Sequence, residues 1–130
     1  MRLILLLFLI PIASFGQITK EGVYDVINQY REIKKRKTLT IDPKLEAFAQ
    51  KSADRMAKNN KVTHVRAVDS YALGGENILG THAKFSNEHV VMLWVDSPSH
   101  AKAMFSKKID SYGVGVAVKG NKVYVACWFR

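Results

Sequence analysis

The sequence predicts an α+β domain: a three-layer α-β-α sandwich around a small, mainly antiparallel sheet. Three observations support this fold class. The front half carries apolar residues at helical spacing, whereas residues 112–129 alternate as two strands joined by a tight turn. Both faces of this predicted hairpin are apolar, so each face needs a covering layer, and the predicted helices are the elements available to supply one.

The front half predicts two helices. From Val23, apolar side chains recur at i, i+3, i+4, i+7 and i+10, which predicts a helix over residues 20–37. A short extended link follows over residues 38–41. Asp42 and Pro43 then form a strong helix start, an N-cap acceptor followed by proline at the first helical position.

This second helix is predicted to stop at Asn59-Asn60. Its inner face carries small side chains, so another element should pack closely against it. These small residues are Ala49, Ser52 and Ala53.

The middle of the chain predicts one strand and two short helices. Residues 71–79 read as a strand entered through a turn, and they contain Gly74-Gly75-Glu76-Asn77-Ile78. Ser86 caps a third helix, whose buried face is predicted to include Val90, Leu93 and Trp94. Ser97-Pro98 ends that helix and starts a fourth, with Ser97 as its cap and His100 in its first turn; the fourth helix runs to about Phe105.

The end of the chain predicts a hairpin with a defined register. Strands over residues 112–119 and 122–129 are joined by Gly120-Asn121, a two-residue turn with glycine first. Small residues are predicted opposite two aromatic ones on one of the faces. The expected pairs are Val118 with Val123, Val116 with Val125, Val114 with Cys127, Ala117 with Tyr124, Gly115 with Ala126 and Gly113 with Trp128.

The first residues predict export. Arg2 is a basic start, Leu3 to Ile10 is an apolar run, and small residues follow, so we expect a signal peptide over residues 1–16 and a domain over 17–130. The run is shorter than the ~20 residues of a membrane span, so no stable span is expected after cleavage; an uncleaved N-terminal anchor is the alternative. We therefore expect a secreted or periplasmic protein.

The single cysteine, Cys127, cannot form an internal disulfide, so packing must hold the fold. The net charge of +9 favours anionic partners such as a cell-envelope polymer or lipid headgroups. Part of it is the run Lys34-Lys35-Arg36-Lys37, for which a solvated helix end is the simpler account. No stacking-aromatic motif accompanies the basic residues, so nucleic acid is not expected as a partner.

The order of these motifs resembles the CAP superfamily, the cysteine-rich secretory, antigen 5 and pathogenesis-related proteins, also called SCP-like domains. The chain shows Asp-Pro-x-Leu opening an alanine-rich helix, a histidine in the following loop, Gly-Glu-Asn-Ile, Trp-x-x-Ser-Pro-x-His, and Gly-Val-Gly-Val before the terminal strand. The resemblance covers residues 20–129 and is to the compact, cysteine-poor bacterial branch. It implies the three-layer sandwich with a central cleft.

In many CAP proteins the cleft holds two histidines and two acidic residues, which in some members bind a divalent metal such as zinc. The resemblance carries these roles to His64, Glu76 and His100. The second acid is absent, because its usual place is taken by Ser97, as is common in bacterial members. The eukaryotic disulfide pattern does not carry over either.

Two interpretations of the three side chains stay open. Neutral imidazoles suit zinc, and Glu76 would be either a third ligand or the group that holds a histidine N–H. At a helix N-terminus the protonated form of His100 is disfavoured, which keeps its ring available as a ligand. Alternatively, His64, Glu76 and His100 form a structural polar network. His82 is a minor further candidate, and His89 is expected to face solvent.

The leading functional hypothesis is therefore a binding module whose cleft holds a divalent metal, Zn²⁺ for example, or a small ligand. A metal-dependent hydrolase of peptide or cell-wall material is the alternative, with Glu76 as the base. We rank catalysis below binding because no Ser-His-Asp or Cys-His context supports a nucleophile. A lipid or sterol carrier, as among some eukaryotic relatives, ranks last because the loops are short.

Overall fold

The computed structural model describes residues 17–65 and 74–130. The predicted signal peptide over 1–16, the polar loop over 66–70 and the first residues of the strand predicted at 71–79 lie outside these ranges. The element order is α1 (Lys20–Ile33), β1 (Thr40–Ile41), α2 (Pro43–Asn59), β2 (Gly75–His82), α3 (Asn87–Val95), α4 (Pro98–Met104), β3 (Ser111–Lys119) and β4 (Lys122–Phe129).

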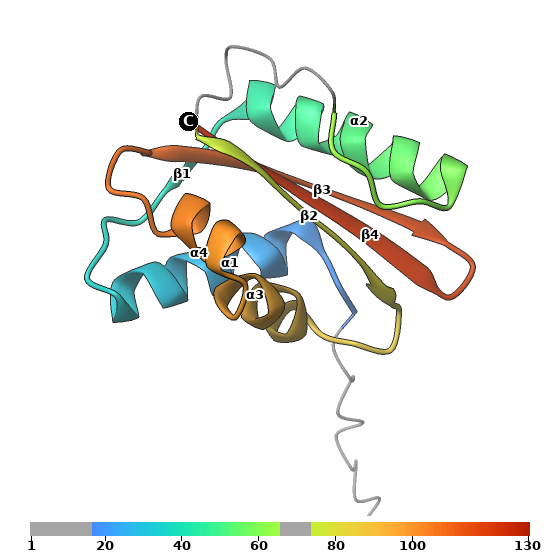
Figure 1. Ribbon diagram of the computed structural model, residues 1–130, viewed down its shortest axis with the longest axis horizontal. Helices are drawn as coiled ribbons and strands as arrows, with labels where there is room; N and C mark the ends of the chain where they lie inside the picture. The colour runs from blue at the N-terminus through green and yellow to red at the C-terminus, as the bar shows by residue number, and fades with distance from the viewer. Residues whose placement is uncertain (1–16, 66–73) are drawn as a thin grey trace, which may run out of the picture.

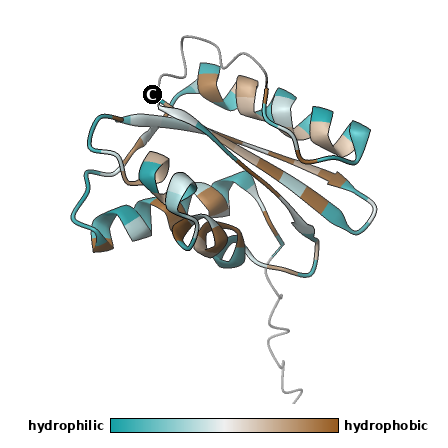
Figure 2. Ribbon diagram, in the orientation of Figure 1, coloured by the Kyte–Doolittle hydropathy of each residue, from teal (hydrophilic) through white to brown (hydrophobic). Residues whose placement is uncertain are grey.

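The elements form three layers, as predicted (Figure 1). The sheet has the order β1-β3-β4-β2, with β1 parallel to β3 and the other neighbours antiparallel. Helix α2 covers one face, and α1, α3 and α4 cover the other. Hydrophobic stretches run along β3, β4 and α3, between the layers (Figure 2). The α+β sandwich with a mainly antiparallel sheet is confirmed.

The C-terminal hairpin has the predicted register. All six expected pairs are present, from Val118 with Val123 to Gly113 with Trp128. Gly120 has a φ of 61°, in the left-handed region, which is why glycine stands first in the turn. The two-residue turn fixes this register, because in a hairpin the length and type of the turn decide which residues pair.

Helix α1 is shorter than predicted, and the basic run follows it instead of forming its last turn. Lys34 caps the helix and Lys35 has a φ of 56°, so the chain turns away in the left-handed conformation. The Lys35 N–H donates to Glu32 O at 2.9 Å and the Arg36 N–H to Arg31 O at 2.7 Å. These bonds satisfy the last carbonyls of the helix, so the prediction of helix to residue 37 was wrong.

The extended link predicted over residues 38–41 contains β1, a two-residue strand that pairs with β3 and is too short to show periodicity. Two further predictions needed correction. The strand predicted at 71–79 is observed as Gly75–His82, so it continues further along the chain. Leu93 is 38% exposed, because α3 buries Val90, Val91 and Trp94 instead.

Helix α2 lies unusually close to β3, at two glycines. A Cβ at Gly113 would lie 2.1 Å from the Glu46 backbone nitrogen, and one at Gly115 would lie 2.3 Å from that of Gln50. Neither position leaves room for any side chain. The small face predicted on α2 therefore meets small residues on β3, and this contact fixes where α2 holds Ser52 over the sheet.

Candidate functional site

Glu76 lies at the start of β2 and is the centre of a buried polar cluster. Gly75, with a φ of 93°, forms the turn before it. The Glu76 side chain is only 1% exposed. Its Oε2 accepts hydrogen bonds from Ser52 Oγ on α2, at 2.9 Å, and from Trp128 Nε1 on β4. Its Oε1 lies 3.0 Å from His64 Nδ1.

His64, in contrast, lies mostly in solvent. Its side chain is 58% exposed although it touches a buried carboxylate. Because an ionised carboxylate can only accept, the Nδ1 atom of His64 carries the proton in this contact. In the neutral ring with its proton on Nδ1, the other nitrogen, Nε2, has a lone pair for a ligand.

His100 is held from the other helical layer. Its Nδ1 lies 2.8 Å from Ser97 Oγ, and its backbone oxygen accepts from Asn77 Nδ2 at 3.1 Å. Ser97 begins α4 as predicted, but its side chain does not cap the helix, because the hydroxyl binds this imidazole instead. The capping role predicted for the Ser97 side chain was therefore wrong.

The two histidines are anchored on consecutive residues of one edge strand. Glu76 and Asn77 face opposite sides of the sheet, because neighbouring side chains in a strand alternate. Glu76 contacts Ser52 on the α2 side, whereas Asn77 reaches α4 on the other side. In the described part of the chain β2 has a single neighbour, β4, so the histidines approach the outer edge of β2 from its two faces.

The burial of His100 affects the protonation of its ring. Burial lowers the pKa of His100, and the charge of the nearby His64 lowers it further. The neutral form expected for His100 is therefore favoured, with burial as the largest cause. A neutral imidazole is the form that binds metals.

The arrangement offers two nitrogen donors and no free carboxylate. Both oxygens of Glu76 lie against Ser52, Trp128 and His64, which is the arrangement of the second predicted role of Glu76, holding the ring of a histidine. Across residues 17–65 and 74–130, no group of three or more His, Cys, Asp or Glu side chains is arranged to hold a metal ion. In both His64 and His100 the ring nitrogen that contacts an oxygen is Nδ1, of Glu76 in one case and of Ser97 in the other.

Sequence reasoning missed the two donors that hold Glu76. Ser52 was interpreted only as a small packing residue, and Trp128 only as a core residue. Trp128 is indeed buried, and it lies directly across from Glu76 in the β2–β4 pairing. That pairing joins strands that are not consecutive in the chain, so no local pattern indicates it.

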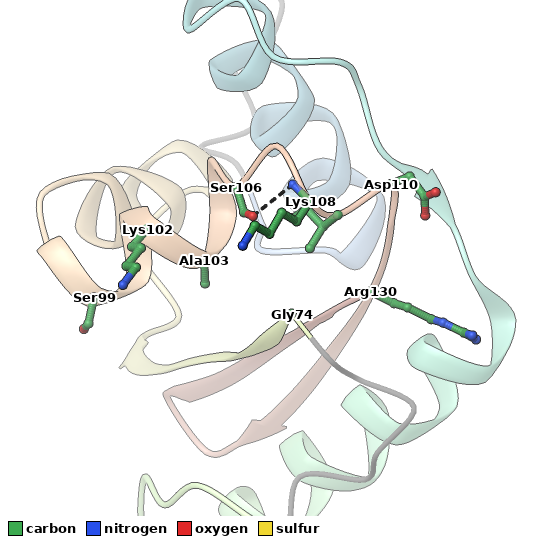
Figure 3. A pocket seen from close by; sticks show the side chains of 9 residues that line it. Gly74, Ser99, Lys102, Ala103, Ser106, Lys108, Asp110 and Arg130 are labelled. Atoms are coloured by element: carbon green, nitrogen blue, oxygen red, sulfur yellow. Dashed lines mark hydrogen bonds between the residues drawn. The ribbon is translucent and has the colours of Figure 1, made fainter.

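The remaining histidines lie elsewhere. His82 is exposed at the far end of β2, where its Nδ1 accepts from the Lys84 N–H at 3.0 Å. His89 stacks on Phe85 with ring centroids 3.9 Å apart. A hollow of about 730 Å³ lies beside α4, and none of the three candidate residues lines it (Figure 3). It is lined by Gly74, Ser99, Lys102, Ala103, Ser106, Lys108, Ile109, Asp110 and Arg130.

Comparison with known proteins identifies the family. The family model described as the cysteine-rich secretory protein family, CAP, matches residues 24–129. This chain belongs to the CAP family. This match confirms the resemblance noted from the motifs. The matched range, residues 24–129, includes every candidate site residue. Among curated proteins, none matches the chain.

Solved structures share the CAP fold at low sequence identity. An outer surface protein of Borrelia burgdorferi has a TM-score of 0.68 and 22% identity, with 88% of this chain and 97% of that protein covered. An extracellular SCP-domain protein of Bacillus anthracis has a TM-score of 0.69 and 22% identity, covering 85% of this chain and 40% of that one. The hookworm platelet inhibitor has a TM-score of 0.58 and 18% identity, covering 90% and 75%.

No helix among residues 17–65 and 74–130 combines the length and the apolar character that crossing a membrane requires.

Proposed function

We propose that this CAP domain is an exported binding module in which His64 and His100 hold a divalent metal, Zn²⁺ for example, or a small ligand at the edge of β2. The observation that carries the proposal is the orientation of the rings. The Nδ1 atom of each lies within hydrogen-bond distance of an oxygen, on Glu76 for His64 and on Ser97 for His100. In the neutral tautomers that donate from Nδ1 to these oxygens, both Nε2 atoms have a lone pair for a ligand.

The donor set fits a metal site with two protein ligands. Zinc favours imidazole nitrogen, and metal-binding histidines usually give their other N–H to a carboxylate or another oxygen. Glu76 and Ser97 fill this supporting role here. A zinc ion held by two imidazoles would supply an open Lewis-acid position for an oxygen ligand. Ser52 and Trp128 would keep the Glu76 carboxylate, and through it the His64 ring, in one orientation.

The burial and the hydrogen bonds of Glu76 favour binding over hydrolysis. A general base must be within reach of the proton that it removes. Glu76 is buried, and its oxygens are directed to Ser52, Trp128 and His64. It therefore supports His64 better than it serves as a base, and the described residues give no other candidate for the hydrolase alternative.

Export is supported by the signal-like residues 1–16 and by the solved relatives, which include an outer surface protein and an extracellular protein. A CAP domain outside the cell would be exposed to free divalent metals and small ligands. The location test is direct: the N-terminal residue of the protein recovered outside the cytoplasm should be Gln17.

Zinc titration of the purified chain tests the site. Saturable uptake should be lost in His64→Ala and in His100→Ala, and Glu76→Gln should weaken it by about 10–100-fold through the loosened His64 ring. His82→Ala is the matched control, because His82 is exposed at the other end of β2, and it should bind like the unmodified chain. Unchanged uptake in both His64→Ala and His100→Ala would refute the site.

A further inference from the structure

A strongly basic groove lies where the chain enters β1 and β3. It is a hollow of about 410 Å³ whose lining has six cationic side chains and one carboxylate. The lining residues are Arg31, Lys35, Arg36, Lys37, Lys107, Lys108, Ile109 and Asp110. The sequence showed two separate basic stretches, at 34–37 and at 107–108, and the fold places them on the two sides of one groove.

Two arginines clamp these stretches together without neutralising them. Arg31, which is 1% exposed, donates from Nε to Lys37 O at 2.8 Å and from Nη1 to Met104 O at 2.7 Å. Arg36 Nε donates to Phe105 O at 2.9 Å. These acceptors are neutral backbone carbonyls, so the two arginines keep their charge in the groove.

The lysines of the groove form no ion pair with any side chain that the structure describes. Lys35, Lys37, Lys107 and Lys108 are exposed. Like charges held close together repel, and a concave surface focuses the resulting positive potential. The free energy of this arrangement falls when an anion with several charges enters the groove.

The kind of cation indicates the kind of anion. The guanidinium groups of Arg31 and Arg36 are directed to carbonyls, so they offer no planar, bidentate clamp for a single carboxylate or phosphate. The free groups are lysine ammoniums, which act as point charges on flexible stems and are well suited to phosphate. No aromatic side chain lines the groove, so stacking of nucleic-acid bases is not provided for.

We propose that this groove binds an extended phosphate polymer without bases, a linear chain of phosphates or phosphodiesters, recognised by its charge density. The groove lies beside β1 and β3, whereas His64 and His100 lie at β2, the opposite edge of the sheet. The two sites can therefore be occupied separately. This inference does not depend on the metal proposed for the histidines, and it assigns a role to six of the 20 lysine and arginine residues of the sequence.

Binding of long-chain inorganic polyphosphate to the purified chain tests the inference. Saturable binding should weaken with salt, with a log-log slope of about −0.7 for each phosphate contact. Lys37→Gln/Lys107→Gln should reduce the affinity by roughly 25-fold at low salt, about fivefold for each lysine, and should make the slope shallower by about 1.4. Inorganic phosphate should bind far more weakly, because it spans only one or two of the lysines.

The matched control is Lys51→Gln/Lys58→Gln, which removes the same charge from exposed positions on α2, in the other layer. It should change the affinity by less than twofold, as should His64→Ala/His100→Ala. Equal losses of affinity in both lysine variants would mean that net charge alone attracts the polymer. That result would refute binding in the groove. Binding to phosphatidylglycerol vesicles but not to polyphosphate would overturn the polymer in favour of a lipid surface. Thermal unfolding of each variant shows that the fold is retained.

Discussion

Replacing Gly115 by alanine should destabilise this domain strongly, although the change adds only one methyl group. The new Cβ would lie 2.3 Å from Gln50 N and 2.4 Å from both the carbonyl carbon and the oxygen of Ala49. These are backbone atoms, so no side-chain rotation relieves the overlap. Ordinary contact begins at 3.4 Å, so α2 would have to withdraw by about 1 Å.

The size of the effect follows from what that withdrawal loosens. Leu45, Ala49 and Met56 on α2 have no exposed surface, and a gap of this width forfeits roughly a quarter to a half of their dispersion contacts across it. The Gln50 side chain also bonds Val116, donating to its oxygen at 2.9 Å and accepting from its nitrogen at 3.1 Å. Overpacking costs about 1–3 kcal/mol and each lost hydrogen bond about 1, so we expect roughly 3–5 kcal/mol.

Urea unfolding followed by tryptophan fluorescence measures this cost, since Trp94 and Trp128 are both buried. With an m-value of about 1–3 kcal/mol/M, the midpoint should fall by at least about 1 M. Gly120→Ala is the comparison, because that site has open space and only the strain of a left-handed φ, about 1–2 kcal/mol. If Gly115→Ala costs no more than Gly120→Ala, the close approach of α2 to β3 is not the constraint that we infer.

Three further predictions follow from other contacts. Lys35→Gly should stabilise the domain by about 1 kcal/mol, because it removes the strain of a left-handed backbone at an exposed residue. Lys34→Gly should not stabilise it, because Lys34 has a φ of −82°. The urea midpoints of the two variants test this difference. Arg31→Met should lower the free energy of unfolding by about 2–4 kcal/mol, because it leaves Lys37 O, Met104 O and Ser106 O without their donor; equal melting temperatures for Arg31→Met and the parent would contradict this. The lowered pKa of His100 means that the unfolded chain binds this proton at higher pH than the folded one. The stability that neutral His100 contributes is therefore fully present above the ordinary histidine pKa of about 6.5. It is lost as the pH falls toward the pKa of His100 in the folded chain. Urea midpoints measured between pH 5 and 8 should rise with pH, less steeply in His100→Gln, and an identical slope in that variant would exclude His100 as the source.

The parts of the fold that could be predicted are those whose pattern repeats along the chain. The hairpin register followed from the two-residue Gly120-Asn121 turn between two alternating stretches, and local end signals bounded α2 at Asp42-Pro43 and Asn59-Asn60. The end of α1 could not be predicted this way, because lysine at a left-handed C-terminal position gives no signal of its own. Strand β1 escaped notice because two residues cannot show a period.

The candidate site, too, could be predicted only in part. His64, Glu76 and His100 were nominated from the order of short motifs, and the structure places His64 against Glu76 and gives His100 a separate partner in Ser97. The role of Ser52 and Trp128 depends on the contact of α2 with the sheet and on the pairing of β2 with β4. Both are long-range features, so the sequence offered only their local roles in packing.

The position of β2 at the margin of the sheet has a consequence for self-association. An exposed strand edge is a template on which another chain can add a strand, and proteins protect such edges with polar or charged side chains. Here the exposed side chain of His64 contacts Glu76 at the start of β2, so a residue of the candidate site also makes that edge a poorer template for aggregation. An apolar replacement of His64 would then threaten solubility as well as the proposed ligand binding.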